Sequence, residues 1–302
     1  MSTHELKILQ SDILLGESPR WHEGKIWFAD WVAETLYAVT EDGRSEVIAR
    51  IASLPFSIDW TPDGTLLVVN ARAKTLQRQA ADGSFETFAD LAPLSDYPFN
   101  EIVVDGRGNI YLNTINFDFP GGEFQPGFIV LVRPDGTVIR QKGDLAFPNG
   151  MAITPDGRTL ICAESYNGNL TAFDIAEDGS LSNQRVWAKL DGQGGDGICI
   201  DAEGAVWAAS GLRCVRVAEG GKVLDEVPLD RMAFACMLGG ADGKTLFIVA
   251  AEWGGTIDII KPTGKLYSTR VAVPHAGYPR SAWRPPAARQ RMPAFSREIE
   301  PS

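Results

Sequence analysis

A repeated turn constrains the fold of this 302-residue chain more than any other sequence feature. A glycine-containing turn precedes a short β-type run six times, in the segments HEGKIWFAD, PDGTLLVVN, GRGNIYLNT, PDGRTLICA, AEGAVWAAS and ADGKTLFIV. The turn glycines are Gly24, Gly64, Gly108, Gly157, Gly204 and Gly243, at successive spacings of 40, 44, 49, 47 and 39 residues. A period of this length is typical of propellers, in which each repeat is one four-stranded blade.

A second turn inside each repeat indicates four strands per unit. These turns are Asp42-Gly43, Asp82-Gly83, Asp135-Gly136, Asp178-Gly179, Gly220-Gly221 and Thr263-Gly264. Asp-Gly between β-type runs is a strong hairpin signal, because glycine tolerates the positive φ of a type I′ turn. The sequence therefore predicts an all-β fold, a six-bladed β-propeller with four antiparallel strands per blade, as one domain over residues 1–302. We expect residues 4–10 to supply the outer strand of the last blade, and the tail from about 280 to 302 to be extended.

Charge and composition exclude several partners. The net charge is −11 and no run of Lys and Arg occurs, which argues against nucleic acid as a partner. No apolar run approaches the length that crosses a bilayer, and the first residues do not resemble a signal peptide, so we expect no membrane partner and a cytoplasmic location. The four scattered cysteines are expected to be reduced. A closed ring suggests a monomer or a weak homo-oligomer.

The starts of the innermost strands carry the candidate site. They lie seven or eight residues before the turn glycines, at Glu17, Ser57, Asn100, Asn149, Asp196 and Ala235. Inner strands surround the channel of a propeller, so these positions form a ring at one mouth, and four of them carry carboxylate or amide oxygens. Such a cluster is costly unless a cation satisfies it, and Ca²⁺ prefers this ligand mixture. We predict one divalent cation, Ca²⁺ first, with Zn²⁺, Mn²⁺, Mg²⁺ and Fe²⁺ open. The alternative is that Asn149-Gly150 and Asp196-Gly197 are only turn dipeptides.

Five sequence blocks carry a family resemblance over about residues 12–265. They are LLGESPRWHEGKIWFAD, FNEIVVDGRGNIYLNT, FPNGMAITPDGRTLICAES, GGDGICIDAEGAVWAAS and CMLGGADGKTLFIV. In this order they resemble the senescence marker protein, gluconolactonase and luciferin-regenerating enzyme family. The resemblance implies a six-bladed propeller with a divalent ion in its channel that hydrolyses lactones. It implies that Glu17 of GESP, Asn149 of FPNG and Asp196 of GGDG are metal ligands, and that Asn100 of FNE contacts the metal or the substrate.

The mechanism expected from this resemblance is metal-assisted opening of a small lactone to the hydroxy acid. The metal acts as a Lewis acid, Asp196 or a metal-bound hydroxide acts as the base, and Asn100 orients the substrate or adds a ligand. Two departures bear on the substrate. Several sugar lactonases of the family have an arginine where this chain has Pro98, so a polyhydroxylated lactone is less secure as the substrate. Trp31 follows Asp30 where a smaller residue is common, and an aromatic mouth suits a less polar ring.

The wall of the pocket is expected to come from the turns that close the inner hairpins at the same mouth. Arg72 is the best candidate for a polar grip in place of the missing arginine. The segment 113–127 exceeds its repeat and is a candidate lid, although a neutral insertion is the alternative. The predicted substrate-binding residues are Asn100, Arg72, Trp31, Glu123, Asn116, Tyr166 and Trp253, with Phe117 beside them; each is alternatively a packing or surface residue.

Other chemistries fit the sequence less well. No GxSxG nucleophile motif is present, and three histidines do not favour a histidine-centred hydrolase or a zinc site of His and Cys. Two rivals remain. One is a metal-dependent phosphotriester or aryl-ester hydrolase on the same propeller. The other is a non-catalytic, metal-stabilised binding or regulatory propeller, which needs neither an oxygen ring nor a lid.

Overall fold

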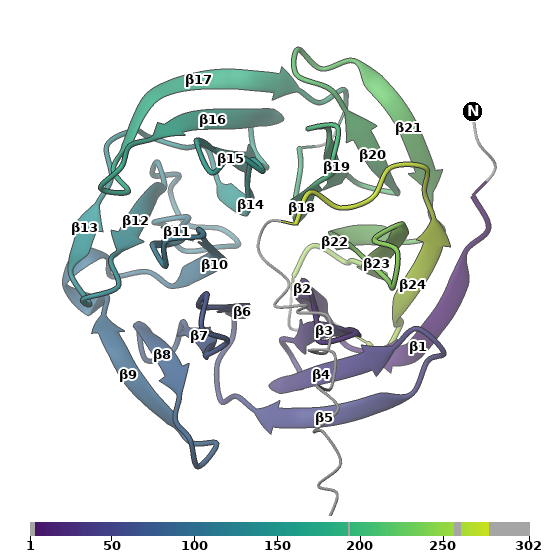
Figure 1. The fold of residues 1–302 in the computed structure, drawn as a ribbon, viewed down its shortest axis with the longest axis horizontal. Coiled ribbons are helices and arrows are strands. Elements are labelled where there is room, and N and C mark those ends of the chain that lie inside the picture. Colours follow the sequence, from purple (N-terminus) through teal and green to yellow (C-terminus); the bar gives the residue numbers. More distant parts are fainter. Residues whose placement is uncertain (1–3, 193, 257–260, 278–302) are drawn as a thin grey trace, which may run out of the picture.

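Six four-stranded antiparallel sheets surround a central channel in the computed structural model (Figure 1), which describes residues 4–192, 194–256 and 261–277. This confirms the predicted six-bladed β-propeller. The innermost strands contact their neighbours around the whole ring, and the first of them also contacts the last, so the ring is closed. The expected extended tail lies outside the described residues.

The first three blades follow one another along the chain, each running from its inner to its outer strand. Blade one contains β2 (Gly16–His22), β3 (Lys25–Asp30), β4 (Thr35–Thr40) and β5 (Ser45–Arg50). Blade two contains β6 (Phe56–Trp60), β7 (Leu66–Asn70), β8 (Thr75–Gln79) and β9 (Phe85–Asp90). Blade three contains β10 (Phe99–Val104), β11 (Ile110–Thr114), β12 (Phe128–Val132) and β13 (Val138–Arg140).

The last three blades repeat this order, except that the sixth takes its outer strand from the start of the chain. Blade four contains β14 (Pro148–Ile153), β15 (Thr159–Glu164), β16 (Asn169–Ile175) and β17 (Leu181–Lys189). Blade five contains β18 (Ile198–Ile200), β19 (Val206–Ala209), β20 (Arg213–Val217) and β21 (Val223–Pro228). Blade six contains β22 (Met232–Gly239), β23 (Thr245–Ala251), β24 (Gly264–Arg270) and β1 (Lys7–Ile13).

Pairing of β1 with β24 closes the ring. The two strands are antiparallel, with Lys7 opposite Ser268 and Ile13 opposite Gly264, and Figure 1 shows purple β1 beside yellow-green β24. The prediction that the N-terminal segment supplies this outer strand is confirmed, with its bounds moved from 4–10 to 7–13. The prediction of a hairpin turn at Thr263-Gly264 is wrong, because Gly264 begins β24 and the next strand outward comes from the other end of the chain.

Among the six turns that join the two innermost strands of a blade, only Glu23-Gly24 has the two positive φ values of a type I′ turn. Glu23 and Gly24 both have positive φ, 48° and 77°, as a type I′ turn requires. At Asp42-Gly43 only the glycine has a positive φ, of 93°, and Thr40 N–H donates to Arg44 O at 3.0 Å. The same holds at Asp82-Gly83, Asp135-Gly136 and Asp178-Gly179, so the type I′ prediction is wrong for the four Asp-Gly turns. The single left-handed glycine of each avoids the cost that a Cβ would bring there. At Gly220-Gly221 both residues have positive φ, 85° and 90°.

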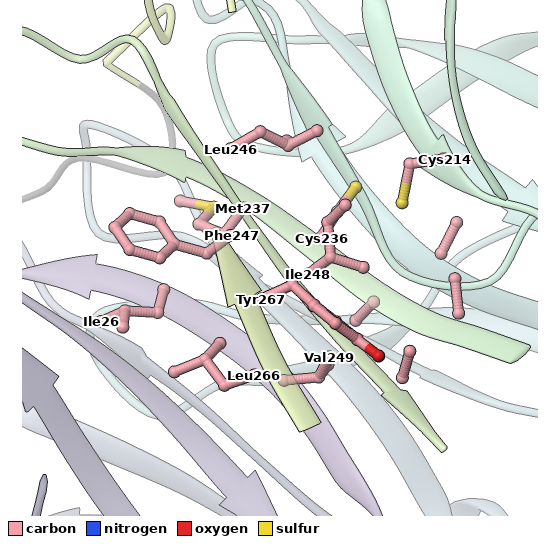
Figure 2. Close-up of a cluster of buried hydrophobic side chains, with 14 of the residues drawn as sticks. Ile26, Cys214, Cys236, Met237, Leu246, Phe247, Ile248, Val249, Leu266 and Tyr267 are labelled. Atoms are coloured by element: carbon pink, nitrogen blue, oxygen red, sulfur yellow. The ribbon is translucent and has the colours of Figure 1, made fainter. Parts of the chain in front are cut away.

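Apolar side chains fill the space between the blades. Figure 2 shows the cluster around blade six, in which Phe247 is fully buried and stacks on Trp21 at 5.3 Å between ring centroids. All four cysteines are buried and free, as expected for reduced thiols. The one helix assigned in the described ranges is a short 3-10 turn at Ala92–Leu94, and no helix there is long and apolar enough to cross a membrane. The core holds the inner strands rigidly around the channel, which fixes the positions of the side chains at its mouth.

Candidate metal centre

The four predicted oxygen-bearing residues meet at one mouth of the channel. Glu17 lies on β2, Asn100 on β10 and Asn149 on β14, while Asp196 precedes β18 by two residues. All four line a single cavity of about 530 Å³. The structure thus brings together residues that are up to 179 positions apart in the chain, from Glu17 to Asp196.

The other two positions of the predicted ring do not line this cavity. Ser57 is fully buried and donates from its hydroxyl to the backbone oxygen of Asn100 at 2.6 Å, which fixes β10 against β6. Ala235 lies inside β22 rather than at its start. Ser57 and Ala235 therefore lie beside the four oxygen-bearing residues and do not line the cavity with them.

Two oxygens in the ring lack hydrogen-bond partners. Asn100 Nδ2 lies 3.4 Å from Asn149 Oδ1, and Asn149 Nδ2 donates to Ser165 Oγ at 3.3 Å. Within the part of the chain that the structure describes, Asn100 Oδ1 and Asp196 Oδ1 are buried and have no such partner. Buried oxygens without donors are rare in folded proteins because each loses its hydration without compensation. A cation between these side chains would satisfy both oxygens.

The electrostatics of the ring also favour a cation. Burial, reinforced by the negative charges of Asp196 and Glu101, raises the pKa of Glu17 well above its ordinary value. Burial and Glu101 likewise raise the pKa of Asp196. Three carboxyl groups therefore compete for ionisation in a poorly hydrated space, and a divalent ion would stabilise their charged forms.

A second polar layer, which the sequence analysis missed, lies close to the ring. The guanidinium of Arg20 donates to the backbone oxygen of Ile102 at 2.6 Å and lies 3.4 Å from Glu101 and 4.0 Å from Asp59. Burial raises the pKa of Asp59 to about 6, against the opposing effect of Arg20. A further comparison of the repeats, one to three residues beyond the ring positions, would have revealed these charged residues on inner strands.

Two glycines allow the ligand-bearing strands to approach each other. A Cβ on Gly150 would lie 2.6 Å from Ile198 N and 2.7 Å from Asp196 O. A Cβ on Gly197 would lie 2.2 Å from the Cβ of Ala235. Gly150 lies within β14, and neither glycine adopts a positive φ. The dipeptides Asn149-Gly150 and Asp196-Gly197 are therefore close-packing features of the channel and not hairpin turns.

The donor set fits a hard divalent cation. The described residues contain no group of three or more His, Cys, Asp or Glu side chains suited to a metal ion. The ring offers two carboxylates and two amides instead, with two unpartnered oxygens among them. Carboxylate and amide oxygens are the ligands that Ca²⁺ takes in proteins, while soft metals prefer sulfur and imidazole.

The predicted pocket wall is found in part. Trp31, Tyr166 and Trp253 line the cavity, together with Phe117 of the long loop. Three predicted substrate-binding residues are not among the lining residues: Arg72, Asn116 and Glu123.

Local contacts explain these three placements. The guanidinium of Arg72 pairs with Glu34 at 2.8 Å, on the exposed surface. Asn116 accepts from Ser95 Oγ at 3.2 Å and donates to Pro126 O at 3.1 Å, so its amide ties the long loop together. The side chain of Glu123 is exposed to solvent. Arg72 therefore does not line the cavity in place of the arginine that sugar lactonases of the family have where this chain has Pro98.

The fold and the ring define a six-bladed propeller with a buried oxygen-rich site at one end of its channel. The sequence profile described as "SMP-30/Gluconolactonase/LRE-like region" matches residues 15–252. The chain therefore belongs to the SMP-30/gluconolactonase/LRE-like family, and the resemblance seen in the sequence is confirmed.

Individual relatives are distant but span most of the chain. Regucalcin from Danio rerio is 28% identical over 259 residues, covering 80% of this chain and 84% of that protein. A 6-deoxy-6-sulfogluconolactonase from Pseudomonas putida is 26% identical over 289 residues, covering 90% and 96%. A crystal structure of a calcium-binding regucalcin from Agrobacterium tumefaciens has a TM-score of 0.74 at 21% identity, covering 90% and 95%. Lactonases are thus among the relatives of this chain.

Proposed function

We propose that this protein is a metal-dependent lactonase that opens a small cyclic ester to its hydroxy acid. The observation that carries the proposal is the ring of Glu17, Asn100, Asn149 and Asp196 at the base of a cavity, with two buried oxygens that lack partners. The lactonase named among the relatives and the calcium-binding regucalcin support the same reading.

In this proposal Glu17, Asn149 and Asp196 hold one divalent cation, Ca²⁺ first, and Asn100 contributes either to the metal or to the substrate. Such an ion supplies Lewis acidity, which polarises a carbonyl oxygen and stabilises the negative charge that develops on it. Ser165 holds the Asn149 amide, and Ser57 fixes the backbone of Asn100. These contacts keep the ring rigid, so little reorganisation is needed during the reaction.

Asp196 is the proposed general base. Its carboxylate has two oxygens, so one can hold the cation while the other accepts a proton from water. The water oxygen bonds to the carbonyl carbon, the bond between that carbon and the ring oxygen breaks, and the ring oxygen takes up the proton. The product is one hydroxy acid per lactone and water consumed.

The test is a pH-indicator assay of lactone opening with chelator-treated protein, before and after restoring each divalent ion. A general base contributes roughly 10²–10⁴-fold, so Asp196→Asn is expected to lower turnover at least about 100-fold. Asp82→Asn, on an exposed turn, is the matched control and should turn over normally. Turnover that survives both chelation and Asp196→Asn would overturn the proposal. Opening of a phosphotriester or phenyl acetate, but of no lactone, would favour the rival hydrolase.

A further inference from the structure

The cavity above the oxygen ring has two aromatic walls. One wall comes from the β11–β12 loop and the segments around β14 and β15, and the other from the loops after β3 and β23 together with β22. Proline rings at positions 55, 98 and 120 also line the cavity. The volume of about 530 Å³ exceeds what a bare five- or six-membered ring needs.

The first wall is a connected cluster of aromatic rings. Phe147 lies 4.7 Å from Tyr166 and 5.1 Å from Phe119 between ring centroids, and 5.8 Å from Phe117. Tyr166 remains 54% exposed and Phe119 43% exposed. Large apolar rings left open to solvent beside a polar site are typical of a surface that a ligand covers.

Backbone strain at Phe147 supports this assignment. Its φ is +62°, a left-handed conformation that costs of order 1–3 kcal/mol for a bulky residue. Its backbone oxygen accepts from Ser165 N–H at 3.0 Å, which helps to hold that conformation. Phe147 lies two residues before Asn149, so the strained turn carries the chain from the aromatic wall directly into the oxygen ring.

The second wall is anchored independently. Trp253 packs edge-to-face on Phe234 at 5.6 Å, and both line the cavity. The indole N–H of Trp31 donates to the backbone oxygen of Phe56 at 2.6 Å. That bond satisfies the polar edge of the indole and leaves its ring as an apolar lining surface.

The charged and polar lining of the cavity argues against anionic and polyhydroxylated lactones as substrates. Its acidic lining residues, within the described parts of the chain, are Glu17, Asp118 and Asp196, and neither lysine nor arginine lines it there. None of these lining residues offers a basic side chain to pair with a sulfonate, phosphate or carboxylate substituent held away from the oxygen ring, and a polyhydroxylated ring would find few partners on aromatic walls. Lys189 belongs to an adjoining groove, which shares four lining residues with the cavity: Ser165, Tyr166, Asp196 and Met232.

From these observations we infer the substrate class: a neutral lactone that carries an aryl or similarly bulky apolar substituent, and not a polyhydroxylated or anionic sugar lactone. The substituent packs between Phe119, Phe147 and Tyr166 on one side and Trp31 and Trp253 on the other. The ester group then reaches the oxygen ring. This inference rests on the proposed lactonase function, because that function places the ester at the ring.

The test separates binding from turnover. Calorimetry with the metal-loaded protein compares 5-phenyl-2-pyrrolidinone, a lactam that resists hydrolysis, with unsubstituted 2-pyrrolidinone. We expect the phenyl compound to bind at least tenfold more tightly. Phe119→Ala and Tyr166→Ala should each remove most of that preference, while Phe88→Ala, on the outer strand β9, should retain it.

Turnover is measured in parallel with γ-phenyl-γ-butyrolactone, γ-butyrolactone, glucono-δ-lactone and a sulfonated gluconolactone. We expect the highest kcat/KM for the phenyl lactone, by at least tenfold. Preferred turnover of either sugar lactone would overturn the inference while leaving the lactonase function intact. Tight binding of the phenyl lactam without turnover of any lactone would overturn the function and leave the cavity assignment intact. Equal binding of the two lactams would overturn the inference.

Discussion

Replacing Gly150 by alanine tests how the metal ligands are brought together. The added Cβ would lie 2.6 Å from Ile198 N and 2.7 Å from both Asp196 O and Gly197 Cα. Ordinary van der Waals contact begins at 3.4 Å, so β14 and the chain before β18 must separate by about 0.8 Å. The atoms that resist are backbone atoms, which cannot rotate away as a flexible side chain can.

The expected magnitudes follow from this displacement. Overpacking of this kind destabilises a protein by about 1–3 kcal/mol. Metal ligands tolerate shifts of only about 0.2 Å, and Asn149 and Asp196 lie on the two segments that must separate. We expect Gly150→Ala to weaken Ca²⁺ binding by roughly 10–100-fold, the range seen when the support of a metal ligand is lost. Calorimetric titration measures the affinity, and urea unfolding measures the stability.

Gly204→Ala is the control for this experiment. Gly204 has a φ of +79° in the turn between β18 and β19, and a Cβ there would meet no atom within 4 Å. This variant is therefore strained and less stable but keeps the ring geometry, so its Ca²⁺ affinity should match that of the wild type. Wild-type affinity in Gly150→Ala, or an equal loss in Gly204→Ala, would refute the reasoning.

Three further variants test other parts of the account. Burial raises the pKa of Asp59 to about 6, so the stability that its protonated form contributes is present below about pH 4 and lost as the pH rises through 6. Urea unfolding should therefore show the wild type losing about 2.4 kcal/mol relative to Asp59→Asn between about pH 4 and pH 7.5; a constant difference contradicts this. Phe247→Ala removes a fully buried ring that stacks on Trp21. It should lower the free energy of unfolding by about 3–5 kcal/mol. A loss below about 1 kcal/mol would argue against tight packing in blade six. Asn100→Ala should lower kcat/KM for lactones at least about tenfold with an unchanged circular dichroism spectrum, and unchanged kinetics would remove Asn100 from the site.

The fold could be read from the sequence because the repeat is local. Each turn glycine lies between strands that pair directly with each other, so hydrophobic runs and turns within about 45 residues specify one blade. The closing strand was also predicted in kind, from the segment 4–10 that precedes the first repeat, although the turn assigned at Thr263-Gly264 was wrong. The exact pairing of this strand was not predictable, since β1 and β24 are joined by contacts between opposite ends of the chain.

The candidate site was predictable where it depends on strand register. Equivalent positions on the inner strands meet around one axis, so Glu17, Asn100, Asn149 and Asp196 could be identified as a group. The pocket wall depends on loops, whose conformations are set by local contacts that no repeat encodes. Arg72 is drawn to Glu34, whereas Phe147 enters the cavity through a strained backbone conformation. Side-chain competition of this kind leaves no periodic signal in a single sequence.

The central claim is that the oxygen ring holds one divalent ion on which lactone opening depends. The most direct measurement is a calorimetric titration of Ca²⁺ into chelator-treated protein, with lactone opening assayed at each point and a Glu17→Gln/Asp196→Asn double variant alongside. The account predicts one ion per chain, turnover that rises in proportion to occupancy, and neither binding nor turnover in the double variant, whose fold is checked by circular dichroism. Full turnover without bound metal, or Ca²⁺ binding of equal strength in the double variant, would contradict it.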